Sequence, residues 1–517
     1  MLGSHALVRS LVDAGVDVCF MNPGTSEMHF VDALDAIPEM RGVLALFEGV
    51  ATGAADGYAR ITGRPAAVLL HLGPGLGNGL ANLHNARRAN TPVVCIVGAH
   101  ATHHEHYDAP LQSDVMTVAH NVSAWVKTSG HPRDVAADAV DAVAAARRAP
   151  GSVSTLVLPA DVSWNEGAST AAPRAVPAPD VVGTEVIDAV AALLHRDETT
   201  MLMLGGVALH ERALRAASRI AAATGVKLLA ETFPARLERG VGVPAVDRLG
   251  YLAEQAEHQL SGVQNLVLVG ARWPVSFFAY PGKKSDLVPE GAHVETLADG
   301  SHDVTRALED LAAAVAAGVE PVLQALALPE EPAGELTVQT LAAALAVTIP
   351  EDAIVVDEAN TSGFMIPSAT AGSPRHDVLT LTGGAIGQGM PVATGAAVAA
   401  PDRAVINVQA DGSALYTIQS LWTQAREQLN VTTVLVNNGA YAILRMELQR
   451  VGAATPGPRA MDMLDLSRPD MNFTEISRGL GVPAVRVSTA EALVAELRRA
   501  LAEPGPHLIE AMVPPIV

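Results

Sequence analysis

Short apolar runs alternate with longer amphipathic stretches along the N-terminal third of the chain. Between residues 1 and about 165 the apolar runs include DVCFMNPG, GVLALFEG, AAVLLHLGPG and TPVVCIVGA, each followed by turn residues. Continuous apolar runs of this length are typical of parallel strands that helices bury on both faces. We therefore predict an α/β domain with a parallel sheet in this part of the chain.

Two further blocks with the same rhythm follow. The segment 171–179 (AAPRAVPAP) is rich in proline and alanine and has no periodicity, which is typical of a linker. Apolar runs at TTMLMLGG, VKLLAET and NLVLVGA then define a second block, and the connector LALPEEPAGE leads into a third. We predict three doubly wound α/β domains, at residues 1–170, 180–325 and 336–517.

Composition excludes several classes of protein. The chain has 517 residues, 49% of them hydrophobic, so it is too long for one core and too apolar to be disordered. Its net charge is −21 without runs of lysine or arginine, which makes nucleic acids and anionic membrane surfaces poor partners.

The cysteines and the N-terminus bear on the compartment. Cys19 and Cys95 both lie in apolar, strand-like runs, so we expect buried thiols in a reducing compartment and no disulfide. The N-terminus begins as an amphipathic helix, not as a signal peptide. No apolar run reaches the roughly 20 residues that a membrane span needs. We therefore expect a soluble, cytoplasmic protein.

The stretch from Ala404 to Leu444 carries the strongest functional pattern. It predicts a strand at 405–409, a tight turn at 411–413, a helix at about 416–428 and a strand at 431–436. A β–helix–β unit of this length is almost always a right-handed crossover between parallel strands. Both strands then end at the same edge of the sheet, which is where open α/β sheets bind ligands.

Asp411 and Asn438 follow those two strands and are expected to converge. A carboxylate and an amide oxygen beside a helix N-terminus suit a hard cation that carries a phosphate. An Asp-Gly turn and an Asn-Gly turn without a ligand would give the same letters. The full pattern, strand–(G/A)DG(S)–helix–strand–NN, resembles the diphosphate-binding motif of thiamine diphosphate (ThDP) enzymes, although Ala410 stands where glycine is usual.

A second set of motifs lies near the N-terminus. The sequence NPGTSE at 22–27 precedes the strand GVLALF, then Glu48 and a helix rich in small residues, then HLGPGLGN at 71–78. This order resembles the pyrimidine domain of the ThDP-dependent 2-oxo acid decarboxylase and acetolactate synthase superfamily, with benzoylformate decarboxylases closest. The resemblance covers the whole chain as pyrimidine, central and diphosphate domains.

The resemblance implies roles for particular residues. Glu48 would share a proton with the aminopyrimidine ring of ThDP, although a glutamate in a first helical turn also interacts favourably with the helix dipole. The pattern GGAIG at 383–387 would place Ile386 under the bend of the cofactor and the Gly384 carbonyl on its amino group. Magnesium would be held by Asp411, Asn438 and the carbonyl of Ala440. The other cofactor contacts that the resemblance implies are Asn360, Thr361, Gly412, Ser413, Tyr441, Ala442 and Ile443.

Substrate residues follow less directly. His71 matches an acid/base histidine of benzoylformate decarboxylases, and Thr25 stands where those enzymes have a serine thought to touch the substrate carboxylate. Gln112 matches a glutamine typical of acetolactate synthases. A second family histidine has no match, because Phe277 lies near its expected place. Ile443 would narrow the pocket, which favours a modest aliphatic substituent over a phenyl ring.

Three other patterns in the sequence do not point to a different function. The histidines at 100, 103, 104 and 106 lie on a polar segment and are interpreted as surface residues. The run GPGLGNG lacks the G-x-G-x-x-G spacing, and no acidic residue stands about 20 positions later, so we do not expect a nicotinamide dehydrogenase. The sequence after GAR at 270–272 lacks the arginine-and-acid feature of flavin-binding acetolactate synthases, so no FAD is expected.

The sequence therefore predicts a homo-oligomeric enzyme that uses ThDP and Mg²⁺ to decarboxylate a small 2-oxo acid. The product would be an aldehyde or, after addition to a second carbonyl, a carboligation product. In this superfamily the cofactor lies between subunits, so Glu48 and Asp411 of one site would come from different chains. The alternative is a non-catalytic paralogue with a binding or regulatory role, which the departures at Ala410 and Phe277 motivate.

Overall fold

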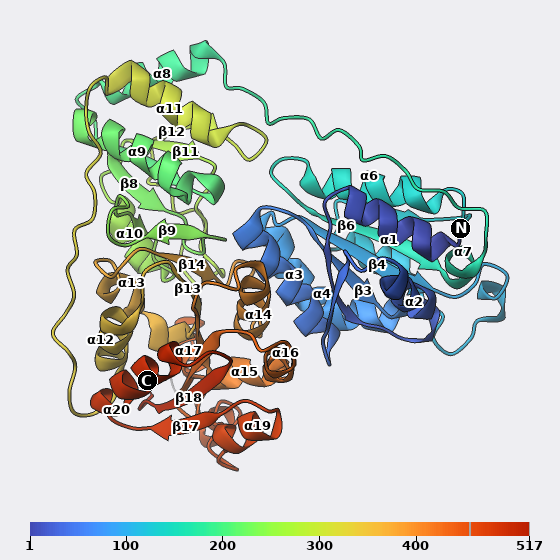
Figure 1. Ribbon diagram of the computed structural model, residues 1–517. Helices are drawn as coiled ribbons and strands as arrows, with labels where there is room; N and C mark the ends of the chain where they lie inside the picture. The colour runs from blue at the N-terminus through green and yellow to red at the C-terminus, as the bar shows by residue number, and fades with distance from the viewer. Residues whose placement is uncertain (454–455, 516–517) are drawn as a thin grey trace.

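Three β-sheets, parallel except for one edge strand of the third and each with helices on both faces, follow one another along the chain (Figure 1). The computed structural model describes residues 1–453 and 456–515. The predicted α/β class with three parallel-sheet units is confirmed. Long segments without helix or strand join the first unit to the second and the second to the third, at the places where we predicted linkers. The exact domain boundaries stay predictions.

The first sheet is built from six parallel strands in the order β2-β1-β3-β4-β6-β5. Strands β3, β4 and β6 are buried along their whole length, as their continuous apolar sequences require. The strands are β1 (Val18–Asn22), β2 (Arg41–Leu44), β3 (Ala66–Leu70), β4 (Val93–Ala99), β5 (Trp125–Thr128) and β6 (Val153–Pro159). One face carries α1 (Gly3–Asp13), α2 (Met28–Ala36), α6 (Val135–Arg147) and α7 (Ala160–Trp164), and the other carries α3 (Glu48–Thr62), α4 (Leu72–Ala89) and α5 (Val115–His120).

The second sheet has five parallel strands in the order β10-β8-β7-β11-β12. The strands are β7 (Thr200–Leu204), β8 (Lys227–Ala230), β10 (Asp247–Arg248), β11 (Asn265–Val269) and β12 (His293–Ala298). Helices α8 (Thr184–Leu194), α9 (Glu211–Thr224) and α11 (Val304–Val315) cover one face, and α10 (Ala253–Leu260) covers the other.

The third sheet has seven strands in the order β17-β18-β16-β15-β13-β14-β9. All pairs are parallel except β9 with β14, so a segment from the middle of the chain forms an antiparallel edge strand. The strands are β9 (Leu237–Arg239), β13 (Ala353–Glu358), β14 (His376–Thr380), β15 (Val405–Ala410), β16 (Val431–Asn437), β17 (Ala484–Val487) and β18 (His507–Met512). One face of this sheet carries α12 (Val338–Thr348), α13 (Ile366–Ala369) and α20 (Ala490–Ala502). The other face carries α14 (Gly389–Ala399), α16 (Ser420–Glu427) and α19 (Phe473–Gly479). The remaining helices of the unit are α15 (Asp411–Thr417), α17 (Ala442–Arg450) and α18 (Pro458–Asp462).

The turn predicted at 411–413 is wrong, because helix α15 begins at Asp411 itself. Ala410 has extended backbone angles and serves as the N-cap, so the strand passes into the helix without an intervening loop. An acidic residue in the first turn interacts favourably with the helix dipole, which supports this early start. The predicted helix at 416–428 is divided, since α15 ends at Thr417 and α16 begins at Ser420.

Both cysteines are free and buried, as predicted. Burial raises the pKa of the Cys95 thiol to about 12 and that of Cys19 well above its usual range. Within residues 1–453 and 456–515, no helix combines the length and the apolar character needed to cross a membrane.

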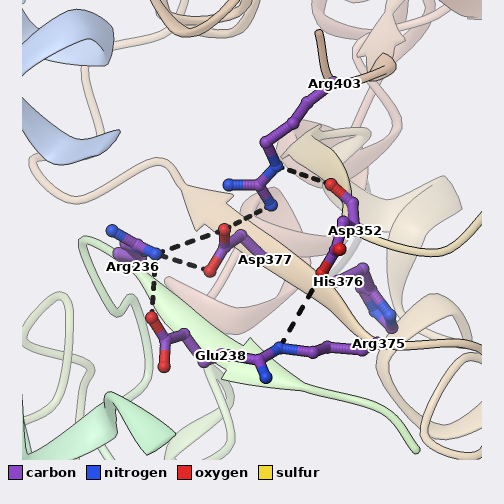
Figure 2. A pocket seen from close by; sticks show the side chains of 7 residues that line it. All are labelled: Arg236, Glu238, Asp352, Arg375, His376, Asp377 and Arg403. Atoms are coloured by element: carbon purple, nitrogen blue, oxygen red, sulfur yellow. Dashed lines mark hydrogen bonds and ion pairs between the residues drawn. The ribbon is translucent and has the colours of Figure 1, made fainter. Parts of the chain in front are cut away.

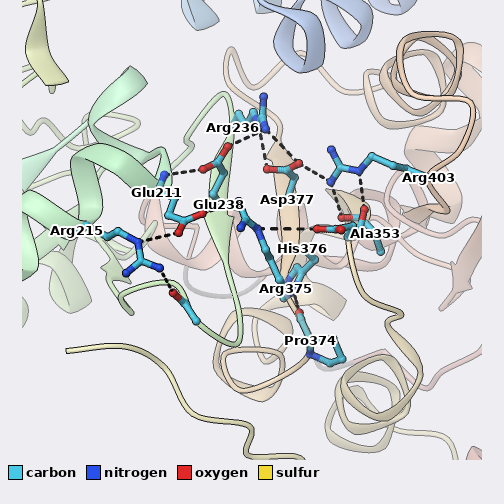
Figure 3. A network of polar contacts seen from close by, with 12 residues as sticks. Glu211, Arg215, Arg236, Glu238, Ala353, Pro374, Arg375, His376, Asp377 and Arg403 are labelled. Carbon is cyan, nitrogen blue, oxygen red and sulfur yellow. Dashed lines mark hydrogen bonds and ion pairs between the residues drawn. The ribbon is translucent and has the colours of Figure 1, made fainter. Parts of the chain in front are cut away.

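A cluster of charged side chains joins the second unit to the third sheet (Figures 2 and 3). Asp377 on β14 pairs with Arg236, at 3.0 Å, and with Arg403, at 2.6 Å. Arg236 also pairs with Glu238 on β9 at 2.8 Å. The cluster borders a cavity of about 190 Å³ lined by Arg236, Glu238, Asp352, Arg375, His376, Asp377 and Arg403. These pairs fix β9 against β14 and so attach the central unit to the C-terminal one.

Replacing Asp377 with asparagine should destabilise the protein. The change leaves two largely buried guanidinium groups without their shared carboxylate, which costs about 3 kcal/mol. We expect a lower Tm in thermal unfolding, whereas Asp402→Asn, at an exposed position nearby in sequence, should leave Tm unchanged. An unaltered Tm for Asp377→Asn would show that this cluster does not hold the units together.

Candidate active site

Asp411 and Asn438 lie together at one edge of the third sheet. Strands β15 and β16 are parallel neighbours, with Ala410 opposite Val436, so the residues that follow them meet. The Asp411 carboxylate accepts hydrogen bonds from the backbone N–H groups of Gly412 at 2.8 Å, Asn438 at 3.1 Å and Gly439 at 2.8 Å. The convergence expected from the crossover rule is therefore present.

The chemistry of these groups suits a divalent cation. Burial raises the pKa of Asp411, and no lysine or arginine of the described residues pairs with it. The side-chain oxygen of Asn438 accepts the N–H of Ala440 at 3.0 Å, which closes a turn directly around the two N–H groups, of Asn438 and Gly439, that bind Asp411. Carboxylate, amide and carbonyl oxygens are the ligands that Mg²⁺ prefers. Across the described residues, no group of three or more His, Cys, Asp or Glu side chains forms a different metal site.

The predicted diphosphate contacts come from the ends of neighbouring strands. Asn360 and Thr361 begin the short helix η4 (Asn360–Gly363) after β13, and β13 pairs with β15. The amide of Asn438 lies 3.4 Å from the hydroxyl of Ser362 in η4. Ser413 lies in the first turn of α15 and donates to the Ala410 carbonyl at 3.1 Å. These hydroxyl and N–H groups surround the edge where Asp411 lies.

The loop after β14 is held by the first unit. His84 and Asn85 on α4 contact the carbonyl oxygens of Gly383, at 3.1 Å, and Ala385, at 2.8 Å. Gly384 has φ +73°, a conformation that favours glycine. Ile386 is half-buried in this loop. The segment predicted to carry the bend of the cofactor is therefore fixed by side chains from α4.

An aromatic cluster covers Gly384. A Cβ atom on Gly384 would lie 2.5 Å from Cζ of Phe277, so the ring packs directly on the glycine backbone. Phe277 also contacts Phe233, Tyr251 and Phe278, with ring centroids 5.0–5.8 Å apart. At Phe277, near the place expected for a histidine, the structure has an apolar ring packed against the loop at 383–387.

Glu48 is the first residue of α3, as predicted, and is 9% exposed. Its Oε2 accepts a hydrogen bond from the side chain of Asn78 at 3.0 Å, and a Cβ on Gly75 would approach its Oε1 to 3.3 Å. In the part of the chain that the structure describes, no hydrogen bond or ion pair joins Glu48 to Asp411.

His71 has a partner that the sequence analysis missed. Its Nδ1 lies 2.8 Å from Oε2 of Glu27, which also accepts the N–H of Gly24 at 2.8 Å. Glu27 is fully buried and its second carboxylate oxygen has no hydrogen-bond partner. Burial raises the pKa of Glu27, while the Gly24 N–H and His71 act in the opposite direction. The one sequence feature that could have pointed to Glu27 is its position as the last residue of the NPGTSE motif.

The remaining predicted substrate residues, Thr25 and Gln112, lie in two separate segments of the first unit. Thr25, in the short helix η1 (Thr25–Glu27), is exposed, and Gln112 is half-buried. A Cβ on Gly73 would meet the Ser113 hydroxyl, so the end of the loop that carries Gln112 packs beside the start of α4. His103, His104 and His106 are exposed, as expected of surface residues. The prediction is wrong for His100, which follows the buried strand β4, is half-buried and has a buried Nε2.

Comparison with known proteins decides the family. The family model "Thiamine pyrophosphate enzyme, N-terminal TPP binding domain" matches residues 1–122, and "Thiamine pyrophosphate enzyme, C-terminal TPP binding domain" matches residues 361–511. A putative acetolactate synthase large subunit, IlvX, from Mycobacterium tuberculosis is 59% identical over the full length of both chains. The chain belongs to the thiamine pyrophosphate enzyme family.

Other members of the thiamine pyrophosphate family show the same likeness. Benzoylformate decarboxylase from Pseudomonas aeruginosa is 29% identical, over 96% of each chain. The solved structure of a ThDP-dependent 4-hydroxybenzoylformate decarboxylase from Rhodococcus jostii RHA1 superposes with a TM-score of 0.87 and 25% identity over 99% of each chain. The protein is therefore a ThDP-dependent enzyme of the acetolactate synthase and benzoylformate decarboxylase type, as the sequence motifs predicted.

Replacing Gly24 with alanine should disturb His71. The added Cβ would lie 2.3 Å from Nδ1 of His71, so the ring must move away from Glu27. We expect cofactor-dependent turnover to fall about 10- to 100-fold, since a misplaced acid/base group loses most of its effect. The matched change Gly130→Ala, in open space, should leave turnover unchanged. Normal turnover of Gly24→Ala would exclude His71 from the reaction.

Proposed function

We propose that the protein uses ThDP and Mg²⁺ to decarboxylate a small 2-oxo acid. The bound acyl group is then either protonated, which gives an aldehyde, or joined to a second carbonyl compound. The observation that carries the proposal is the buried carboxylate of Asp411 beside Asn438. Among residues 1–453 and 456–515 this carboxylate has no cationic side chain as partner, and it lies at the edge where parallel sheets bind ligands. The chain belongs to a family of ThDP enzymes, which supports ThDP as the ligand of this edge.

The residues for the cofactor come from three loops. Asp411, Asn438 and the Ala440 carbonyl would hold Mg²⁺, and the Gly384 carbonyl and Ile386 would orient the organic part. ThDP, when bound, supplies the electron sink that allows carbon dioxide to leave. The groups proposed to line its diphosphate and ring are those of Asn360, Thr361, Gly412, Ser413, Tyr441, Ala442 and Ile443.

Two groups would hold and move protons. Oε2 of Glu48 is engaged by Asn78, so Oε1 is the atom free to exchange a proton with the cofactor. Nδ1 of His71 faces the Glu27 carboxylate, which leaves Nε2 to exchange a proton with the substrate. Thr25 and Gln112 are proposed to contact the substrate.

A second copy of the chain is proposed to complete the site. Large apolar side chains stay exposed around this edge of the third unit, with Tyr416 52% and Phe364 48% accessible. Several large exposed apolar side chains on neighbouring elements are typical of an interface. The others are Met365, Leu415 and Leu444. A homo-oligomer that covers them could supply Glu48 from the neighbouring chain.

We propose that the central unit binds no flavin. In the second sheet the N–H groups that could receive a phosphate are taken by the chain's own carboxylates: Gly206 donates to Glu231 at 2.9 Å and Glu211 donates to Glu238 at 2.6 Å. A dinucleotide would have to displace these carboxylates. The buried free thiols Cys19 and Cys95 support a cytoplasmic location.

Carbon dioxide release from a panel of 2-oxo acids, pyruvate through benzoylformate, tests the function. We expect release that requires both ThDP and Mg²⁺ and stops on addition of EDTA. An aldehyde product would identify a decarboxylase, and a 2-hydroxyketone or acetohydroxy acid a carboligase. No release and no bound ThDP would favour the non-catalytic alternative.

Glu48→Gln should remove activity without removing the cofactor. The amide cannot exchange the proton at Oε1, so turnover should fall about 10²- to 10⁴-fold while ThDP binding, measured by calorimetry, persists. Glu185→Gln, in the first turn of α8, changes an exposed helix-dipole partner and should leave turnover unchanged. Equal turnover of the two variants would show that Glu48 only interacts with the dipole of α3 and takes no part in the reaction.

Ile443→Ala should widen the acyl pocket. We expect kcat/KM for benzoylformate to rise about 10-fold relative to pyruvate, because space for a phenyl ring appears beside the cofactor. Val451→Ala, just beyond the other end of α17, serves as the control. An unchanged ratio of kcat/KM for benzoylformate to that for pyruvate would show that the acyl group does not lie beside Ile443.

A further inference from the structure

Glu358 is a fully buried carboxylate that the proposed mechanism does not use. It ends β13, two residues before Asn360, and is 2% exposed. Burial raises its pKa to about 7, and backbone N–H groups and Gln409 act against this rise. No charged side chain of the described residues forms an ion pair with it.

The Glu358 carboxylate fastens the loop that carries Ile386. One oxygen accepts the N–H of Gly387 at 2.6 Å, and the other accepts the N–H of Gly389 at the start of α14. Charge-assisted hydrogen bonds to backbone N–H groups are among the stronger ones in proteins. The turn between Ile386 and α14 is therefore closed by a single side chain from a different strand.

The same carboxylate is linked to the diphosphate side of the site. Gln409, at the end of β15, donates to Glu358 at 3.1 Å and to the Ser413 hydroxyl at 2.6 Å. Glu358 thus connects the loop of Ile386 with the first turn of α15. These are the two segments between which the cofactor is proposed to lie.

Helix α3 holds the opposite side of this loop. Gln388 donates to Asp56 at 2.8 Å, and Asp56 forms a buried ion pair with Arg60 at 2.6 Å. Arg60 in turn donates to the carbonyl of Thr380 at 2.8 Å and to the hydroxyl of Thr382 at 2.9 Å. Asp56 and Glu358 thus both hold the loop, but only the charge of Asp56 is balanced by a cation, Arg60.

No ion pair accounts for the burial of a carboxylate at position 358. Burying a carboxylate without a cation is unfavourable, and a neutral side chain of similar size would cost less. The preceding residue, Asp357, points to the other face of the strand, where the guanidinium of Arg248 lies 3.9 Å away. Of these two successive acids Glu358 is buried and Asp357 half-buried, and only Asp357 has a cation beside it.

We propose that Glu358 is a positioning residue of the ThDP site, which in its ionised form holds the Ile386 loop in register with Ser413. This inference rests on the proposed function, which assigns Ile386 and Ser413 to the cofactor. Protonation of Glu358 removes one acceptor from the pair of backbone N–H groups and loosens the turn. ThDP affinity is then highest where Glu358 is ionised and falls as the pH is lowered.

The ionisable groups around Glu358 are few. On α3 they are Asp56 and Arg60, which reach the loop through Gln388; α15 carries Asp411, and Asp357 faces away. Because the pKa of Glu358 is raised in the folded protein, its contribution to stability is present below its unfolded pKa of 4.5 and is lost as pH rises toward 7. The ionised form of Glu358, which is proposed to favour ThDP binding, is thus the form that lowers the free energy of unfolding.

The test is ThDP affinity, measured by calorimetry with Mg²⁺ present, at pH 6, 7 and 8. We expect Glu358→Gln to weaken binding at pH 8 by about 10- to 100-fold, because one of two charge-assisted acceptors is lost. Affinity of the natural protein should fall from pH 8 to pH 6, and this dependence should be weaker in the variant. The matched change Asp357→Asn should leave affinity within about twofold.

The decline of the apo-protein's Tm between pH 5 and 7.5 gives a second readout. It should be smaller in Glu358→Gln than in the natural protein, because the variant has no group to ionise. An affinity and pH dependence equal to those of the natural protein, or an equal loss in Asp357→Asn, would overturn the inference and leave the proposed function intact. Should Glu358→Gln not fold, Gln409→Leu carries the test, and undiminished ThDP affinity would again overturn it. Failure of the natural protein to bind ThDP would instead refute the proposed function, and the inference with it.

Discussion

The contact between α3 and α14 is the constraint on which the site depends. A Cβ on Gly57 would lie 2.1 Å from the Val392 carbonyl oxygen, and one on Gly395 would lie 1.8 Å from the Ala54 carbonyl oxygen. Only glycine permits two helices to approach this closely. The apolar core between the helices continues from the first sheet into the third, so the two units share one packed interior. From this contact, side chains of α3 and α4 reach the loop that is proposed to bend the cofactor.

Buried carboxylates are the second common feature of the site. Burial raises the pKa of Glu27, Glu358 and Asp411, and each lies at the end of a strand or in the helix that follows one. Groups with such perturbed pKa values are common at functional sites, where binding or catalysis needs a charged or titratable side chain although its burial lowers stability. In this protein Glu27 orients His71, Asp411 has the ligand chemistry of a Mg²⁺ site, and Glu358 closes a loop.

Much of this architecture could be predicted from the sequence because its signals are local. The continuous apolar runs predicted the buried parallel strands, and crossover handedness predicted that Asp411 and Asn438 would meet. The short strands β5, β9, β10 and β17 escaped notice because they are only partly buried and have two to four residues. Glu27 and Glu358 escaped because their partners lie on other elements: His71 is 44 residues from Glu27, and Gly387 is 29 residues from Glu358. Such contacts appear only once the sheets are assembled.

The central claim is that Glu48 of one chain and Asp411 of another form one site, and mixed oligomers test it most directly. Glu48→Gln and Asp411→Asn chains, each inactive alone, would be co-expressed with different affinity tags, and the mixed species purified through both. A site formed between chains leaves one intact combination in each mixed pair, so turnover should return to about half of that of the natural protein. A site formed within one chain leaves none, and mixed oligomers without activity would contradict the account.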